Sequence, residues 1–133
     1  MSAALVDTDV VSLLYKRDSR AELYEPHLSQ RILAVSFMTI AELERWTMER
    51  NWGAARHSRL TDYLQQFVVL FADEELCRKW AGISTARRRA GRPIQTADAW
   101  IAATAVQYRV PLITHNRSDY EMVEGLTVIS ADS

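Results

Sequence analysis

Cysteine, lysine and glycine are scarce in this chain. The one cysteine, Cys77, excludes an internal disulfide and a cysteine-based zinc site, which fits a reducing compartment, and we expect a cytoplasmic protein. No segment is rich in glycine, serine or proline, so nothing marks a linker. No apolar run approaches the roughly 20 residues of a membrane span, and Asp7 follows the start too closely for a signal peptide. These absences predict one globular domain over residues 1–133, without a membrane segment.

Lysine is rare in a chain that has many arginines. Only Lys16 and Lys79 are lysines among 16 basic residues, although the net charge is only -1. Arginine forks onto phosphate and stacks on bases, so the run at 87–89 with Arg92 predicts a basic face toward nucleic acid. A genome with GC-rich codons and a solvated helix face would produce the same bias.

Short apolar runs alternate with amphipathic segments along the chain. Strands are expected at residues 3–7, 31–35, 68–71, 112–114 and 127–130. Helices are expected at 8–17, 19–28, 36–51, 54–67, 73–89 and 96–108. The last of these helices is mostly small and apolar and is expected to be buried. This alternation predicts an α/β fold with a central parallel sheet and helices on both faces, a three-layer α/β/α arrangement.

Four acids stand where such a fold would bring them together. Asp7 closes the first strand, Asp119 follows the fourth, and Glu42 and Asp98 are expected in the first turns of two helices. The carboxyl ends of parallel strands meet along one edge, where open α/β sheets bind ligands. Bare carboxylates there would repel one another, and a hard divalent cation would remove that repulsion. The all-oxygen set predicts Mg²⁺ or Mn²⁺, and such a site can hydrolyse phosphodiesters without a side-chain nucleophile.

Each acid also has a structural explanation. Thr39 and Glu42 match a capping box, in which the glutamate would serve only the helix start. Asp98 could stabilise a helix start, and Asp119 could form an Asx turn. Asp7 has the weakest alternative, because an acid that closes an apolar strand needs a partner or water.

These acids lie in segments that resemble the PIN-domain nucleases, and in particular the VapC-type toxins of bacterial toxin–antitoxin pairs. The resembling blocks are LVDTDVVSLL with Asp7, TIAELERW with Glu42, TADAWIAATA with Asp98, and LITHNRSDY with Asp119. They occur in the family's order and cover most of the chain. The resemblance implies a Mg²⁺- or Mn²⁺-dependent ribonuclease in which these four acids are catalytic and bind the metal.

The resemblance carries further expectations. Thr8, Thr114 and Asn116 would support the metal site by hydrogen bonding, and Arg87, Arg88, Arg89 and Arg92 become candidate RNA-binding residues. The partners would be an RNA substrate and a cognate antitoxin protein, and the chain would form a homodimer. The departures from the family pattern are Asp9, His115 and Tyr120. For Asp9 we weigh a fifth, outer ligand against a solvated helix cap and favour the cap; His115 is expected to be a satisfied polar residue.

Two other functions fit parts of the pattern. Asp7-Thr8-Asp9-Val10 matches the Asp-x-Asp nucleophile motif of haloacid-dehalogenase-like phosphatases, but neither Lys16 nor Lys79 follows a strand as that chemistry requires. The other alternative is a module that binds a metal or a partner without turnover. A metal-dependent cleavage assay on mixed RNA separates all three functions.

Overall fold

The computed structural model describes residues 2–131 and contains a five-stranded, all-parallel sheet in the order β3-β2-β1-β4-β5. The strands are β1 (Ala3–Val6), β2 (Ile32–Ser36), β3 (Val68–Leu70), β4 (Leu112–Ile113) and β5 (Val128–Ile129). The helices are α1 (Thr8–Tyr15), α2 (Glu25–Leu28), α3 (Phe37–Glu49), α4 (Ala54–Leu64), α5 (Glu74–Arg89) and α6 (Thr96–Tyr108), with 3-10 helices η1 (Ser19–Leu23) and η2 (Arg117–Tyr120).

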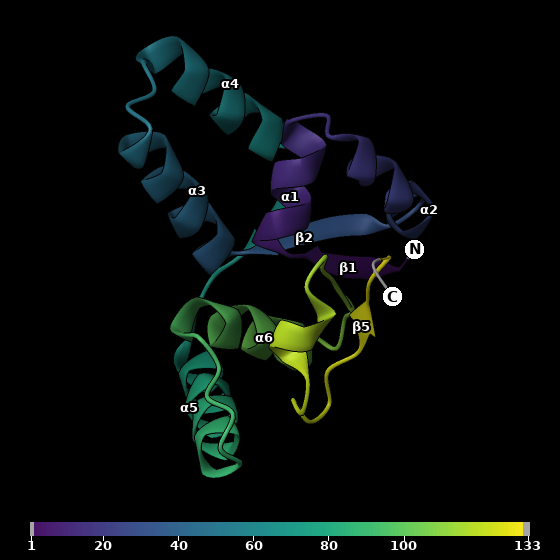
Figure 1. The fold of residues 1–133 in the computed structure, drawn as a ribbon, viewed down its shortest axis with the longest axis vertical. Helices are drawn as coiled ribbons and strands as arrows, with labels where there is room; N and C mark the ends of the chain where they lie inside the picture. The colour runs from purple at the N-terminus through teal and green to yellow at the C-terminus, as the bar shows by residue number, and fades with distance from the viewer. Residues whose placement is uncertain (1, 132–133) are drawn as a thin grey trace.

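The helices form one layer on each face of the sheet. Figure 1 shows α1, α3 and α4 on one side and α5 and α6 on the other. Strand residues alternate between the layers: Ala4 and Val6 pack in a core with α1, α3 and α4, whereas Leu5 packs in a second core with α6. The predicted three-layer α/β/α fold is confirmed, and α6 is largely buried, as its small apolar residues predicted.

The order of the strands places the end of β1 at a special point. From β1 the chain adds β2 and then β3 on one side, and after α5 and α6 it returns to place β4 on the other side. Strand order therefore reverses between β1 and β4, and the crevice outside their carboxyl ends is the expected ligand position. Asp7 follows β1 directly and lies at this reversal.

The starts predicted at residues 19 and 96 agree with η1 and α6, and the start predicted at residue 36 differs from α3 by one residue. Ser36, the last residue of β2, caps α3 by accepting a hydrogen bond from the Met38 backbone N–H (3.0 Å), so Thr39 lies inside the helix and the capping box is wrong. Gln95 occupies the N-cap position of α6, and Asp18 caps η1 by accepting from the Arg20 backbone N–H (2.9 Å). Several polar residues in a row can each serve as a cap, and the direction of the preceding segment decides which one does.

None of the helices between residues 2 and 131 combines the length and the apolar character that a membrane crossing requires.

Candidate active site

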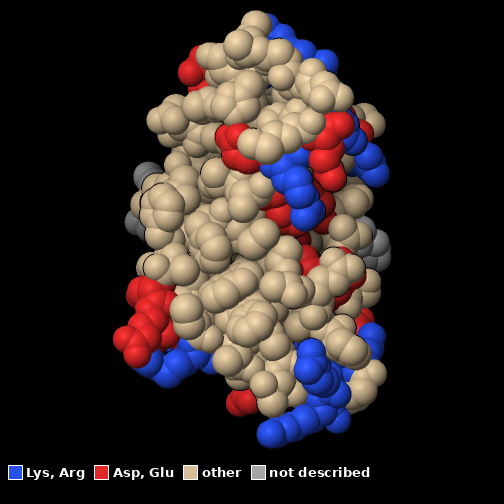
Figure 2. Space-filling view, turned by 90° about the vertical axis from the view of Figure 1, so that its left-hand side faces the viewer, with Lys and Arg blue, Asp and Glu red and all other residues tan. Residues whose placement is uncertain are grey.

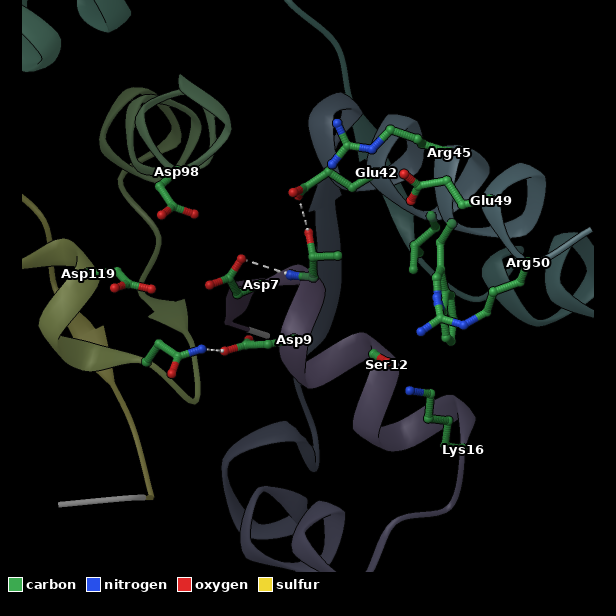
Figure 3. Close-up of a pocket in the computed structure, with 14 residues that line it drawn as sticks. Asp7, Asp9, Ser12, Lys16, Glu42, Arg45, Glu49, Arg50, Asp98 and Asp119 are labelled. Carbon is green, nitrogen blue, oxygen red and sulfur yellow. Dashed lines mark hydrogen bonds between the residues drawn. The ribbon is translucent and has the colours of Figure 1, made fainter. Parts of the chain in front are cut away.

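A cavity of about 450 Å³ opens at the carboxyl edge of the sheet, and all four predicted acids line it (Figure 3). Asp7 enters it from the end of β1, Asp98 from the first turn of α6, and Asp119 from η2. Glu42 enters from the second turn of α3, not from the first turn as predicted, because the helix begins at Phe37. The structure thus brings together acids that are separated by up to 112 residues of sequence (119 minus 7).

Asp7 is the most constrained of the four acids. Its side chain is only 6% exposed, and it accepts hydrogen bonds from the Thr8 backbone N–H (2.8 Å), the Thr114 hydroxyl (2.8 Å) and the Tyr120 hydroxyl (2.9 Å). Burial, followed by the negative charge of Asp9, raises the pKa of Asp7 to about 7. This carboxylate is fixed in place, and its charge is costly without a cation nearby.

Asp98 experiences the charges of the other acids. Burial is the main cause that raises its pKa to about 6, followed by the negative charge of Asp119, and Glu42 and Asp9 add to the effect. The acids are therefore close enough to influence one another electrostatically. Among the described residues, however, no three Asp, Glu, His or Cys side chains are grouped closely enough to hold an ion as they stand.

Threonines and an asparagine hold the acids in position. The Thr8 hydroxyl donates to Glu42 Oε1 (2.8 Å) and, having spent its one proton, accepts from Thr39 (2.8 Å). Thr114 donates to Asp7 and accepts from the Asn116 backbone N–H (3.1 Å). Thr8 and Thr114, two of the three residues expected to support the site, therefore form hydrogen bonds within it. Asn116, the third, bonds Asp9.

Asp9 is not a solvated helix cap, and that prediction is wrong. Its Oδ2 accepts from the His115 backbone N–H (3.0 Å) and from the Asn116 side-chain amide (2.7 Å). The carboxylate therefore ties the loop after β4 to the first turn of α1, and burial raises its pKa. Asp9 also lines the cavity.

Tyr120 is a site residue that the sequence pattern did not reveal. Its hydroxyl lies 2.9 Å from Asp7 Oδ2 and 3.3 Å from Asp98 Oδ1, and its ring is buried. Burial and the adjacent carboxylates raise its pKa far above the usual value, so it remains a neutral donor. Nothing in the local sequence distinguishes it from a core aromatic residue.

The predicted basic face at 87–92 does not form as expected. Arg87 is 6% exposed and donates to three backbone carbonyls, those of Arg92 (2.6 Å), Asp119 (3.2 Å) and Glu121 (2.8 Å). Arg92 forms an ion pair with Glu121 (3.2 Å). Arg88 and Arg89 are exposed but border a different hollow, beside Trp80. Arg87 is therefore a structural residue that fixes the segment carrying Asp119.

Instead, cations of α1 and α3 line the cavity. They are Lys16, Arg45 and Arg50. A signal for Lys16 and Arg45 exists in the sequence, since Asp9, Ser12 and Lys16 follow helical spacing, and so do Glu42, Arg45 and Glu49. Each series begins with an acid at the floor of the cavity and includes one cation farther along.

Comparison with known proteins identifies the fold and the family. The family model described as PIN domain matches residues 4–125. The chain belongs to the PIN-domain family. It is 28% identical over 130 residues to Ribonuclease VapC1 of Haemophilus influenzae, covering 92% of each chain. It is 32% identical over 98 residues to Ribonuclease VapC4 of Mycobacterium tuberculosis, covering 72% of this chain and 75% of that one.

Solved structures agree with this assignment. VapBC-1 from nontypeable Haemophilus influenzae superposes with a TM-score of 0.81 at 25% identity, covering 98% of this chain and 99% of that one. VapBC2 from Rickettsia felis, bound to a DNA fragment from its promoter, superposes with a TM-score of 0.84 at 18% identity and supports the fold, covering 96% and 98%. The predicted resemblance of this PIN-domain chain to VapC-type proteins is confirmed.

Proposed function

We propose that this PIN-domain chain is a divalent-metal-dependent endoribonuclease and the toxin of a toxin–antitoxin pair. The observation that carries the proposal is the convergence of Asp7, Glu42, Asp98 and Asp119 on one cavity at the strand-order reversal. Ribonuclease VapC1 of Haemophilus influenzae matches 92% of this chain, which supports the same activity here. The substrate bond would be a phosphodiester of RNA.

The residues of the cavity suit Mg²⁺ or Mn²⁺. Every ligand candidate is a carboxylate oxygen, and the pKa values of Asp7 and Asp98 are raised in the way expected of acids that lack a cation. Mg²⁺ commonly binds through one or two carboxylates and retains several waters, so a tight cage of three is not required. Asp7, Glu42, Asp98 and Asp119, the four acids that line the cavity, would hold the ion directly or through its waters.

When bound, the ion would polarise a phosphoryl oxygen and lower the pKa of a water molecule. The chain supplies the rest of the chemistry. Three hydrogen-bond donors fix Asp7, and Tyr120 holds Asp7 and Asp98 at a set separation. Glu42, oriented by the Thr8 hydroxyl, is the carboxylate on the α3 side that can accept a proton from an attacking water. The His115 imidazole bonds the hydroxyl of the buried Tyr24, and His115 contacts an acid only through its backbone N–H, which donates to Asp9.

Partners follow from the same relationship. Relatives with this fold were solved as VapBC complexes, so we propose that this chain binds a cognate antitoxin and forms a homodimer. An antitoxin segment that silences the site would place a basic side chain among the acids, where it would relieve their repulsion. Co-expression with the product of the adjacent gene, followed by light scattering, tests both expectations.

Cleavage of mixed RNA tests the activity. We expect EDTA to abolish it and Mg²⁺ or Mn²⁺ to restore it. Asp7→Asn, Glu42→Gln, Asp98→Asn and Asp119→Asn should each reduce kcat by about 100-fold or more, the usual scale for removal of one charge-stabilising group. Asp62→Asn, on the exposed side of α4, is the matched control. His115→Ala should cost less than any of the four.

Three outcomes would contradict the proposal. Activity that survives exhaustive chelation would exclude the metal mechanism. Binding of metal without any cleavage of RNA would favour a module without turnover, and hydrolysis of small phosphomonoesters instead of RNA would favour an Asp-nucleophile phosphatase.

A further inference from the structure

The wall of the acid cavity formed by α1 and α3 is basic. It comprises Arg45 of α3 together with Lys16 and Arg50, which directly follow α1 and α3, and we call these three residues the cationic wall. In Figure 3 Lys16 and Arg50 extend toward each other on the side of the cavity away from Asp98 and Asp119. Figure 2 shows the same contrast from outside, with blue side chains at the rim of a red recess. One cavity therefore joins an acidic floor to a basic wall.

An aromatic ring holds two of these cations in place. The Lys16 ammonium lies 4.5 Å from the centre of the Trp46 ring, and the Arg50 guanidinium carbon lies 4.3 Å from it. Trp46 is itself half-buried and packs against Trp52, with ring centres 5.2 Å apart. The cation–π contacts restrict two long side chains that would otherwise move freely, and so keep their charges beside the cavity.

The charges of the cationic wall are not neutralised by the fold. Within residues 2–131, Lys16, Arg45 and Arg50 form no ion pair, whereas Arg78, Lys79 and Arg92 each pair with a glutamate. Glu42 and Glu49 of α3 line the cavity as well, and among the described residues neither forms an ion pair with these cations. Such unpaired cations held beside a site attract an anion that the protein itself does not provide.

We propose that the cationic wall binds the backbone phosphates that flank the cleaved phosphate of a single-stranded RNA. This proposal rests on the proposed ribonuclease activity, since it describes how the same site holds its substrate. Asp7 lies buried at the floor of the cavity, and a single strand, whose backbone bends freely, is the form of RNA that we expect to enter it. The neighbouring phosphates of the same strand then lie beside the cationic wall.

The cationic wall would contact the RNA on one side of the cleaved bond and not on the other. On the other side of Asp98 and Asp119 lies a second hollow of about 500 Å³, whose arginines are Arg87 and Arg92. Arg87 donates to backbone carbonyls and Arg92 pairs with Glu121, so neither offers a free charge. Nucleotides added on one side of the cleaved bond should therefore strengthen binding, and nucleotides added on the other side should not.

Steady-state kinetics on a single-stranded RNA test the proposal. The variants are Lys16→Gln, Arg45→Gln, Arg50→Gln and the double variant Lys16→Gln/Arg50→Gln. The matched controls are Lys79→Gln on α5 and Arg59→Gln on α4, which remove the same charge outside the cavity. We expect KM to rise about tenfold in the double variant with a smaller change in kcat, because the lost contacts act on bound substrate and transition state alike.

Salt dependence and substrate length provide readouts that a structural defect would not produce. Each lost phosphate contact should make the plot of log kcat/KM against log salt shallower by about 0.7, the value for single strands. Extending the RNA on one side of the cut should raise kcat/KM in the parent, and this gain should shrink in the double variant. Trp46→Leu should weaken binding less, because it releases the cations without removing them; thermal melts would verify folding of every variant.

The proposal fails if the cavity variants match Lys79→Gln and Arg59→Gln in KM, salt slope and length dependence while the parent cleaves RNA. Fluorescence anisotropy with labelled RNA separates this failure from that of the proposed function. If the parent cleaves no RNA while the double variant binds RNA more weakly than the controls do, the proposal for the cationic wall is retained, and the proposed ribonuclease activity is wrong.

Discussion

The two hollows on either side of Asp98 and Asp119 contain arginines in opposite states. On the α1 and α3 side, Arg45 and Arg50 carry charges that no acid neutralises; on the α5 side, Arg87 is buried against three carbonyls and Arg92 is paired. Arginine supplies several donors in a rigid fork, and the same side chain can hold a loop or bind a phosphate. Whether an arginine holds a loop or binds a phosphate depends on the partners that the fold places around it. A run of arginines in the sequence does not determine this.

The largest effect should come from Arg87. Arg87→Gln leaves carbonyls of Arg92, Asp119 and Glu121 without their donors, and we expect it to lower the free energy of unfolding by about 3 kcal/mol. Arg88→Gln removes the same charge from the exposed neighbouring residue and should cost less than about 0.5 kcal/mol. Urea denaturation of both variants measures the difference. An equal loss of unfolding free energy in the two variants would show that Arg87 has no special structural role, and the contrast between the two hollows would be wrong.

Metal should stabilise the acids that both hollows share. At about ten times its dissociation constant, Mg²⁺ should add about 1.4 kcal/mol to the free energy of unfolding by mass action. Asp98→Asn should gain less, because one ligand candidate has lost its charge. Thermal melts at constant ionic strength test this, with Asp62→Asn as the control. An unchanged increment in Asp98→Asn would make Asp98 a helix-start residue.

The pH dependence of the metal-free protein should be unusual for carboxylates. The folded pKa values of Asp98 and Asp7 are raised from 3.8 to about 6 and about 7, so the folded chain binds more protons than the unfolded chain in that window. Stability should therefore fall as pH rises from about 4 to about 7. Asp98→Asn should flatten the curve and be more stable than the parent at pH 8 in EDTA, by about 1 kcal/mol. A metal-free parent that gains stability over this range would show that burial and the neighbouring charges do not raise the pKa values of Asp7 and Asp98.

The smallest effect should come from the exposed arginines of α5. Arg88→Gln/Arg89→Gln removes two charges that border the hollow beside Trp80, outside the acid cavity. We expect its KM for single-stranded RNA to change by less than about twofold, since exposed charges at a distance are screened by salt. A rise in KM equal to that of Lys16→Gln/Arg50→Gln would instead support the prediction that the arginines at 87–92 form an RNA-binding face.

Much of the fold was predictable because its signals are local. Alternating apolar and amphipathic segments required a parallel sheet covered by helices, and the small apolar residues of α6 required burial. Asp7 was recognisable because an acid directly after a buried strand needs partners, which Thr114 and Tyr120 supply. Helix starts were less predictable, as Ser36 and Thr39 show, because neighbouring polar residues compete for the same role.

Residues whose role depends on distant partners were not predictable in the same way. Asp9 looked like a cap until the structure placed the loop after β4 against it, and Tyr120 looked like any core aromatic residue. Lys16 continues the polar stripe of α1, but only the packing of α1 against α3 brings Lys16 and Arg50 to one ring. Such contacts join segments far apart in the chain, and no local pattern encodes them.

The sequence by itself determined the layers, the strand-to-helix turns and the four acids, because hydrophobic period and residue type act over a few positions. Tertiary structure alone decided which arginines are free. A guanidinium beside three unpaired carbonyls becomes part of the fold, whereas one beside an aromatic ring at the edge of a cavity keeps its charge for a ligand. Both begin as the same residue, and only the partners that the fold places around them differ.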